Sequence, residues 1–151
     1  DLIREDVNPQ TPTIMRYITQ SEAKSLSNTP PCWGIYICGL VFKWLKNMGG
    51  LDVMKQRNID KAAILYDYLD SSKLFKGTAD KDCRSLMNVP FVTGSDELDA
   101  LFVSEAKDHN IESIKGHRSV GGMRASIYNA MPKAGVEALV EFMESFEKAH
   151  A

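Results

Sequence analysis

The order of the secondary-structure elements predicted from this amino-acid sequence indicates an α+β fold, in which helices pack on a small, mostly antiparallel sheet. Two long helical stretches come first, and short strand-like stretches alternate with helices after them. No internal repeat or low-complexity tract is visible. The chain has 151 residues, of which 44% are hydrophobic and 25% are charged, so it has the length and composition of about one globular domain with its own core.

The first part of the chain is predicted to be irregular. Residues 7–31 contain Asn-Pro and Thr-Pro pairs and several serines, which are typical of loops. A helix is expected to begin at residues 28–31, where asparagine and threonine precede two prolines, and to end at Gly49 and Gly50. Its apolar side chains point in nearly every direction, which predicts a helix that is buried on most sides.

The remaining elements follow from hydrophobic periodicity. A second helix is predicted over residues 51–70, and residues 96–109 form an amphipathic helix. Short strands and the last helix complete the fold, with strands at 74–76, 85–92, 111–114 and 124–128, a glycine-rich loop at 116–122 and a helix at 133–148.

Composition excludes several classes of protein. The net charge of −2 argues against a nucleic-acid-binding surface. The cysteines, Cys32, Cys38 and Cys83, are odd in number, form no CxxC motif and have no histidine at metal-ligand spacing, so neither a disulfide framework nor a metal site is expected. The longest apolar run, residues 30–42, is too short to span a bilayer, and the charged N-terminus is not expected to be a signal peptide. These features favour a cytoplasmic protein that binds no membrane.

Residues 116–129 contain the clearest chemical signal, GHRSVGGMRASIYN. Glycines allow positive φ and close approach of a ligand, and the guanidinium fork of arginine matches a carboxylate or phosphate bidentately. His117 beside Arg118 adds affinity for a dianion, above all when it is protonated. The alternative is a tight turn with solvated charges. Arg124 weakens that alternative, because a charge in a strand-like stretch requires a partner. We therefore expect a site for a small, doubly anionic molecule.

A second candidate site lies at the start of the first long helix. Asn28 or Thr29 could cap that helix by accepting hydrogen bonds from its first amides, which is a purely structural role. The functional alternative is that these side chains, together with the positive end of the helix, hold a phosphate.

Three segments of the chain resemble phosphoserine aminotransferases, in the order found in that family: NTPPCWGIYICGLVFKWLKNMGG, RSLMNVPF and KGHRSVGGMRASIYNAMP. The resemblance runs through essentially all 151 residues. The family belongs to the fold-type I, class V aminotransferases, which use pyridoxal 5'-phosphate, and it works as a homodimer with active sites at the subunit interface. The resemblance implies that this chain is the C-terminal portion. Residues 1–30 would be the end of the large-domain segment and a connecting loop, and residues 31–151 the small domain with its leading long helix.

The resemblance also implies roles for five residues. Asn28 and Thr29 match the pair that contacts the cofactor phosphate of the neighbouring subunit. His117 and Arg118 match residues that bind the substrate phosphate, and Arg124 matches the arginine that binds the α-carboxylate. The Schiff-base lysine of the family lies upstream of the segment matched here, so no catalytic residue is expected in this chain.

Two lysines of this chain, Lys46 and Lys115, are alternatives to that upstream lysine. Lys46 precedes Asn47, Met48 and the two glycines, which superficially resembles a lysine–asparagine–glycine cofactor motif. Its place at a helix end favours an interpretation as a solvated lysine. Lys115, which precedes the glycine-rich loop at 116–122, is also not expected to bind the cofactor covalently.

The function implied by the resemblance is a transamination of serine biosynthesis. Glutamate and 3-phosphohydroxypyruvate would give 2-oxoglutarate and 3-phosphoserine in the parent protein, whereas the isolated chain would be inactive. Two alternatives remain open at this point. The chain could be a truncated, non-catalytic small-domain protein that associates with a partner, or it could belong to a related class V aminotransferase with another substrate. The histidine–arginine pair favours a phosphorylated substrate.

Overall fold

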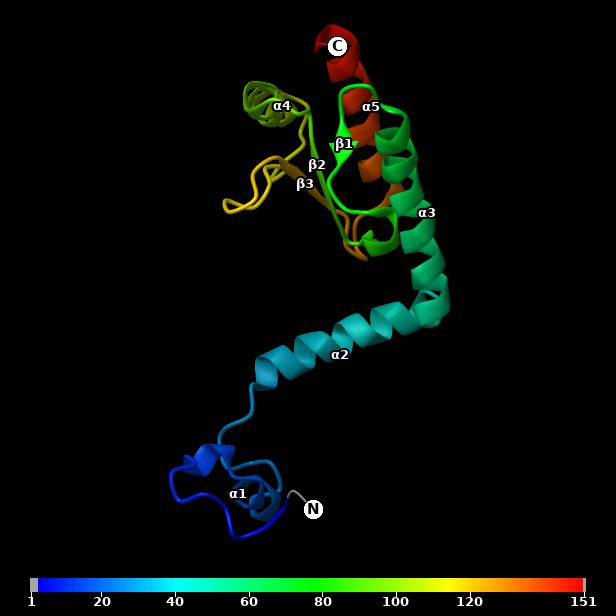
Figure 1. Ribbon diagram of the computed structural model, residues 1–151. Coiled ribbons are helices and arrows are strands. Elements are labelled where there is room, and N and C mark those ends of the chain that lie inside the picture. The colour runs from blue at the N-terminus through cyan, green and yellow to red at the C-terminus, as the bar shows by residue number, and fades with distance from the viewer. Residues whose placement is uncertain (1–2, 151) are drawn as a thin grey trace. The chain divides into compact units, whose positions relative to one another are not determined.

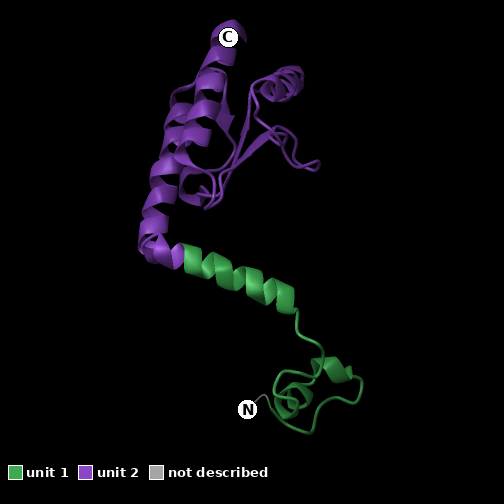
Figure 2. Ribbon diagram, turned by 180° about the vertical axis from the view of Figure 1, so that it is seen from behind, with its two compact units in different colours: residues 1–44 green, residues 45–151 purple. Residues whose placement is uncertain are grey.

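A computed structural model describes residues 3–150, which form two compact units (Figure 2). Unit 1 ends at Trp44 and unit 2 begins at Leu45. The division falls within helix α2 (Cys32–Asn47). The boundary expected at residue 30, between a large-domain segment and a small domain, remains a prediction.

Within the described residues of unit 1, two short helices precede α2. These are the 3-10 helix η1 (Thr13–Met15) and α1 (Tyr17–Glu22), so the prediction that residues 7–31 are all loop was wrong for this stretch. Side-chain hydrogen bonds to nearby backbone carbonyls stabilise the turns of this stretch. For example, Arg16 Nε donates to the carbonyl of Thr11 at 2.9 Å. Helices this short carry too little periodicity to be recognised from the sequence.

Helix α2 ends where the glycines predicted. Gly49 has a φ of +104°, and its N–H donates to the carbonyl of Lys46 at 3.2 Å. A Cβ on Gly49 would lie 2.8 Å from Val53 Cγ2, so glycine is favoured by both backbone and space. The helix begins later than expected, at Cys32, because the carbonyl of Pro31 is the first to accept a helical hydrogen bond, from Ile35 N at 3.0 Å.

The surface of α2 differs from the prediction. No residue of α2 is buried, and its aromatic side chains are strongly exposed, with 76% of Trp33 and 66% of Phe42 accessible. The expected burial on most sides was therefore wrong within residues 3–150, because no described element covers the apolar positions of this helix. Despite this apolar surface, none of the helices in residues 3–150 is long and apolar enough to cross a membrane.

Unit 2 has the predicted α+β architecture (Figure 1). The three strands of its described residues form one antiparallel sheet in the order β1-β2-β3, and Pro90 of β2 pairs with Arg124 of β3. Helices α3 and α5 run side by side. The elements in chain order are α3 (Gly50–Ser71), β1 (Lys76–Gly77), the 3-10 helix η2 (Lys81–Cys83), β2 (Asn88–Val92), α4 (Asp96–Asp108), β3 (Met123–Ser126) and α5 (Lys133–His150).

The strand predicted at residues 111–114 does not form. Asn110 and Ser113 both have a φ of +58°, a left-handed conformation that interrupts extended backbone. Only a bridge between Lys115 and Met123 remains of the expected pairing. The apolar pattern of this segment is explained instead by Ile114, which is buried in the core.

The core lies on one face of the sheet. Phe102 of α4 is fully buried at its centre, and its ring contacts four others at centroid distances of 4.9 to 6.0 Å. These rings come from the segment before β1, from β2 and from α5: Phe75, Phe91, Phe142 and Phe146. Helices α3, α4 and α5 therefore cover the same face, and the opposite face of β2 and β3 is only half-buried.

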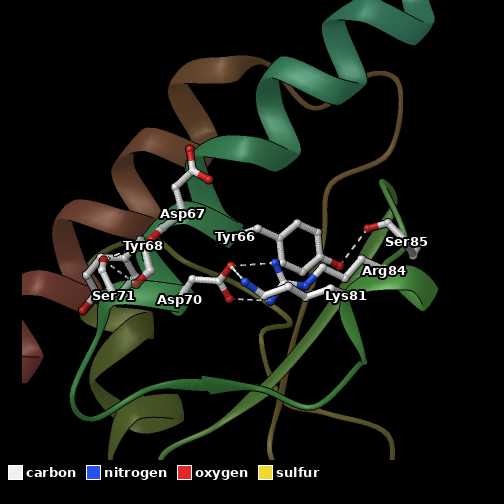
Figure 3. A network of polar contacts seen from close by, with 8 residues as sticks. All are labelled: Tyr66, Asp67, Tyr68, Asp70, Ser71, Lys81, Arg84 and Ser85. Carbon is white, nitrogen blue, oxygen red and sulfur yellow. Dashed lines mark hydrogen bonds and ion pairs between the residues drawn. The ribbon is translucent and has the colours of Figure 1, made fainter.

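A polar network holds the end of α3 to the segment that leads into β2 (Figure 3). Arg84 and Lys81 both pair with Asp70, and the Arg84 guanidinium lies 4.5 Å from the ring centroid of Tyr66. The Tyr66 hydroxyl donates to the carbonyl of Ser85 at 2.9 Å. The hydrogen bond from Arg84 is the main cause that lowers the pKa of Asp70 to about 2.

A second network joins α5 to the turn after α3. Each of the two carboxylate oxygens of Glu147 accepts two hydrogen bonds. Oε1 accepts from the amides of Lys73 (2.7 Å) and Leu74 (3.2 Å), and Oε2 accepts from the hydroxyls of Tyr68 (2.6 Å) and Ser72 (2.8 Å). Partial burial alone would raise the pKa of Glu147, but these four hydrogen bonds outweigh it, so its pKa lies below the usual value.

We expect Glu147→Gln to lower the free energy of unfolding by about 2 kcal/mol at neutral pH, because the amide nitrogen of glutamine cannot accept two of the four hydrogen bonds that the carboxylate accepts. The folded-state pKa is depressed, so the contribution is present above the unfolded value near 4.5 and is lost as the pH falls through the folded value. Urea denaturation between pH 7 and 3 should show the wild-type advantage shrinking in acid. Glu144→Gln, at an exposed position one turn earlier, is the control. A difference that does not change with pH would contradict this role.

Candidate anion-binding site

Arg124 occupies the half-buried face of the sheet. Its neighbours in β3, Met123 and Ala125, are buried in the core, so the Arg124 side chain points to the opposite face. Its backbone N–H donates to the carbonyl of Ile114 at 2.8 Å. Its Nε is buried and has no hydrogen-bond partner within residues 3–150. A buried donor of a charged group is costly when unpaired, and this arrangement favours an anionic ligand.

Arg124 also lines a cavity of about 510 Å³ on the side of β3 that faces away from β2. The cavity lies between the edge strand, the segment at 109–114 and the start of α5. Among its polar walls are Ser126 of β3 and Ser113 of the preceding segment. Its apolar walls include Ile111, Ile127, Met131 and Leu139.

The loop at residues 116–122 is closed on itself. Gly116 N donates to the carbonyl of Gly122 at 2.8 Å, and the amides of Val120 and Gly121 both donate to the carbonyl of His117 at 2.9 Å. A Cβ on Gly116 would collide with the carbonyl oxygen of Gly121. The close approach of the two loop ends is therefore the physical reason for glycine at position 116.

His117 and Arg118 are exposed on this loop, which projects from the rest of unit 2 and is drawn in yellow in Figure 1. The His117 Nδ1 atom lies 2.7 Å from Ser119 Oγ and accepts a hydrogen bond from Ser119 N at 3.3 Å. Neither His117 nor Arg118 lines the cavity that Arg124 lines. One chain segment thus carries all three candidate residues, while the cavity itself includes only Arg124.

Asn28 and Thr29 lie in unit 1, outside any helix or strand. Both are exposed, and within residues 3–150 neither side chain takes part in a hydrogen bond, so neither caps α2. An amide and a hydroxyl supply hydrogen-bond donors, and the first amides of a helix add a positive dipole end. The residues present therefore fit a phosphate group chemically, and their role as its ligands remains a prediction.

A buried lysine was not recognised in the sequence. Lys61 of α3 is only 4% exposed, and its Nζ donates to the carbonyls of Tyr128 (2.7 Å) and Met131 (3.1 Å). Burial lowers the pKa of Lys61. These contacts hold the turn between β3 and α5, next to the cavity. By contrast, the two lysines that the sequence brought forward, Lys46 and Lys115, are both exposed.

The sequence of this chain, including the segment that carries Arg124, matches a known protein family. Residues 8–139 match the family described as aminotransferase class-V, and the chain belongs to this family. Within it, the chain is similar to phosphoserine aminotransferases. It is 52% identical to that of Haemophilus influenzae over 150 residues, which are 97% of this chain and 41% of the relative. It is 51% identical to that of Streptococcus agalactiae over 99% of this chain and 42% of the relative. The chain thus spans about two fifths of the length of these relatives.

Solved structures agree with the sequence relatives. The chain resembles the phosphoserine aminotransferase of Bacillus circulans subsp. alkalophilus with a TM-score of 0.88 and 45% identity, over 95% of this chain and 40% of that one. It resembles the pyridoxal-phosphate-bound enzyme of Trichomonas vaginalis with a TM-score of 0.83 and 38% identity, over 93% of this chain and 40% of that one. The predicted resemblance and fold class are therefore confirmed.

Proposed function

We propose that this chain is the substrate-anchoring part of a phosphoserine aminotransferase that uses pyridoxal 5'-phosphate. The parent protein would transfer an amino group between glutamate and 3-phosphohydroxypyruvate in serine biosynthesis. The observation that carries this proposal is the buried Nε of Arg124, which has no hydrogen-bond partner within residues 3–150 and so leaves a charged donor for an anion. The name of the relatives, phosphoserine aminotransferase, supports phosphoserine as one of the substrates.

In this proposal each anchor has its own task. Arg124 holds the α-carboxylate, which glutamate and phosphoserine both carry, by its planar fork of donors. His117 and Arg118 hold the phosphate of the phosphorylated substrate, and their exposure on a projecting loop supports access for a ligand. Fixed contacts at two ends of one substrate orient its reacting centre between them.

The cofactor is proposed to lie mainly on parts of the enzyme other than this chain. Pyridoxal phosphate supplies the electron sink for transamination when it is bound. Asn28 and Thr29 would donate to its phosphate in the neighbouring subunit of a homodimer, and the lysine that attaches it would lie outside this chain. We further propose that the parent enzyme is cytoplasmic.

A second candidate function rests on α2. Its exposed aromatic and aliphatic side chains form an apolar surface of the kind that marks protein interaction sites. A non-catalytic protein that associates with a partner through α2 would also account for this surface. Unlike the first proposal, it requires no ligand at Arg124, whose Nε would then stay unpaired.

Titration of the purified 151-residue chain with pyridoxal phosphate tests where the attachment lysine lies. We expect no specific absorbance change, and borohydride reduction followed by peptide mapping should label no single lysine stoichiometrically. A full-length phosphoserine aminotransferase is the positive control, and circular dichroism establishes that the chain is folded. Stoichiometric labelling of one residue, such as Lys46, Lys61 or Lys115, would show that the chain holds its own attachment lysine and would overturn this part of the proposal.

A further inference from the structure

We propose that Ser119 is a positioning residue, which turns Nδ1 of His117 toward the loop and thereby presents the Nε2–H of His117 to the phosphate of the substrate. The inference rests on the proposed function and deepens it, because it assigns a role in specificity to Ser119, which would act on the substrate through His117 and not by direct contact. Three observations support it.

The first observation is the polarity of the contacts to Nδ1. The backbone N–H of Ser119 donates to Nδ1 at 3.3 Å, and an amide nitrogen of the backbone can only donate. Nδ1 is therefore the acceptor, so the neutral ring carries its proton on Nε2. The Ser119 hydroxyl, 2.7 Å from the same nitrogen, then donates as well.

The second observation is the shape of the loop. The amides of Val120 and Gly121 both donate to the carbonyl of His117 at 2.9 Å, which forms a tight turn. This turn brings the hydroxyl of Ser119 to Nδ1 of His117, two residues away. Both contacts to the imidazole come from one residue, so a single substitution can test the arrangement.

The third observation is exposure. His117, Arg118 and Ser119 are all exposed, and His117 has no other hydrogen bond from its ring within residues 3–150. The Nε2–H is thus available to an incoming oxygen, next to a guanidinium of fixed charge. An N–H donor of His117 beside Arg118 favours a phosphate, and a substrate without a phosphate gains nothing from it.

The experiment compares Ser119→Ala with Ser119→Thr. Long-range ¹H–¹⁵N NMR of the 151-residue chain reports the tautomer of each histidine, and with only three histidines His117 is assigned from His117→Gln. We expect the Nε2–H form of His117 in the wild type and in Ser119→Thr, and a larger Nδ1–H fraction in Ser119→Ala. An Nδ1–H form in the wild-type chain would overturn the proposal.

Kinetics in the complete aminotransferase polypeptide supply the second readout. Ser119→Ala should raise KM for phosphoserine about 5-fold, the effect of one neutral hydrogen bond, and leave KM for glutamate unchanged. Ser119→Thr should restore the wild-type value. Equal rises for both substrates, or no rise for phosphoserine, would overturn the positioning role. The tautomer measurement needs no activity, so it separates failure of this inference from failure of the proposed function.

Discussion

Replacing Arg124 by alanine is expected to lower kcat/KM about 100-fold or more for both proposed substrate pairs of the complete enzyme. Glutamate and phosphoserine share the α-carboxylate, so the loss should be similar for each. Removal of one partner from a desolvated, hydrogen-bonded charge pair costs about 2–5 kcal/mol, and 1.4 kcal/mol corresponds to tenfold. Steady-state kinetics with each substrate pair provide the measurement.

Two variants make this test specific. Arg124→Lys retains the charge but not the planar fork, so we expect a partial loss for both substrates. His117→Ala should instead raise KM for phosphoserine about 10-fold and affect glutamate little, because only one substrate carries a phosphate. Unchanged kinetics in Arg124→Ala would remove the basis of the proposed function, and equal losses in His117→Ala would contradict its assignment to the phosphate.

Gly122→Ala is expected to lower the free energy of unfolding by about 3 kcal/mol. Gly122 has a φ of +61°, and a Cβ there would lie 2.6 Å from Val92 Cγ1 and 2.9 Å from the carbonyl oxygen of Phe91. The substitution therefore combines an unfavourable backbone conformation with overpacking against β2. Urea denaturation of the chain, monitored by circular dichroism, measures the loss.

The neighbouring glycine is a matched control. Gly121 also has a positive φ, of +80°, but a Cβ there meets no atom within 4 Å. Gly121→Ala should therefore cost only about 1 kcal/mol, the effect of the backbone conformation alone. Equal losses in the two variants would mean that contact with β2 does not hold the loop.

The fold class could be predicted because its signals are local. The helical periodicity of α3, α4 and α5 acts over a few residues, and the end of α2 follows from the positive φ of Gly49. The family resemblance likewise came from short segments, above all the one that contains His117, Arg118 and Arg124. The local pattern gave a wrong prediction at residues 111–114, where the positive φ of Asn110 and Ser113 interrupts the expected strand.

The sequence by itself thus determined the α+β class, the family and the residue types that suit an anion. Only the tertiary structure decided which buried polar groups have hydrogen-bond partners and which do not, because the partners that exist lie far away in the sequence. The ammonium group of Lys61 donates hydrogen bonds to carbonyls that lie 67 and 70 residues away in the sequence. The Nε of Arg124 in β3, by contrast, is buried with no acceptor within residues 3–150. Burial and hydrogen-bond satisfaction depend on long-range packing, which no local pattern encodes.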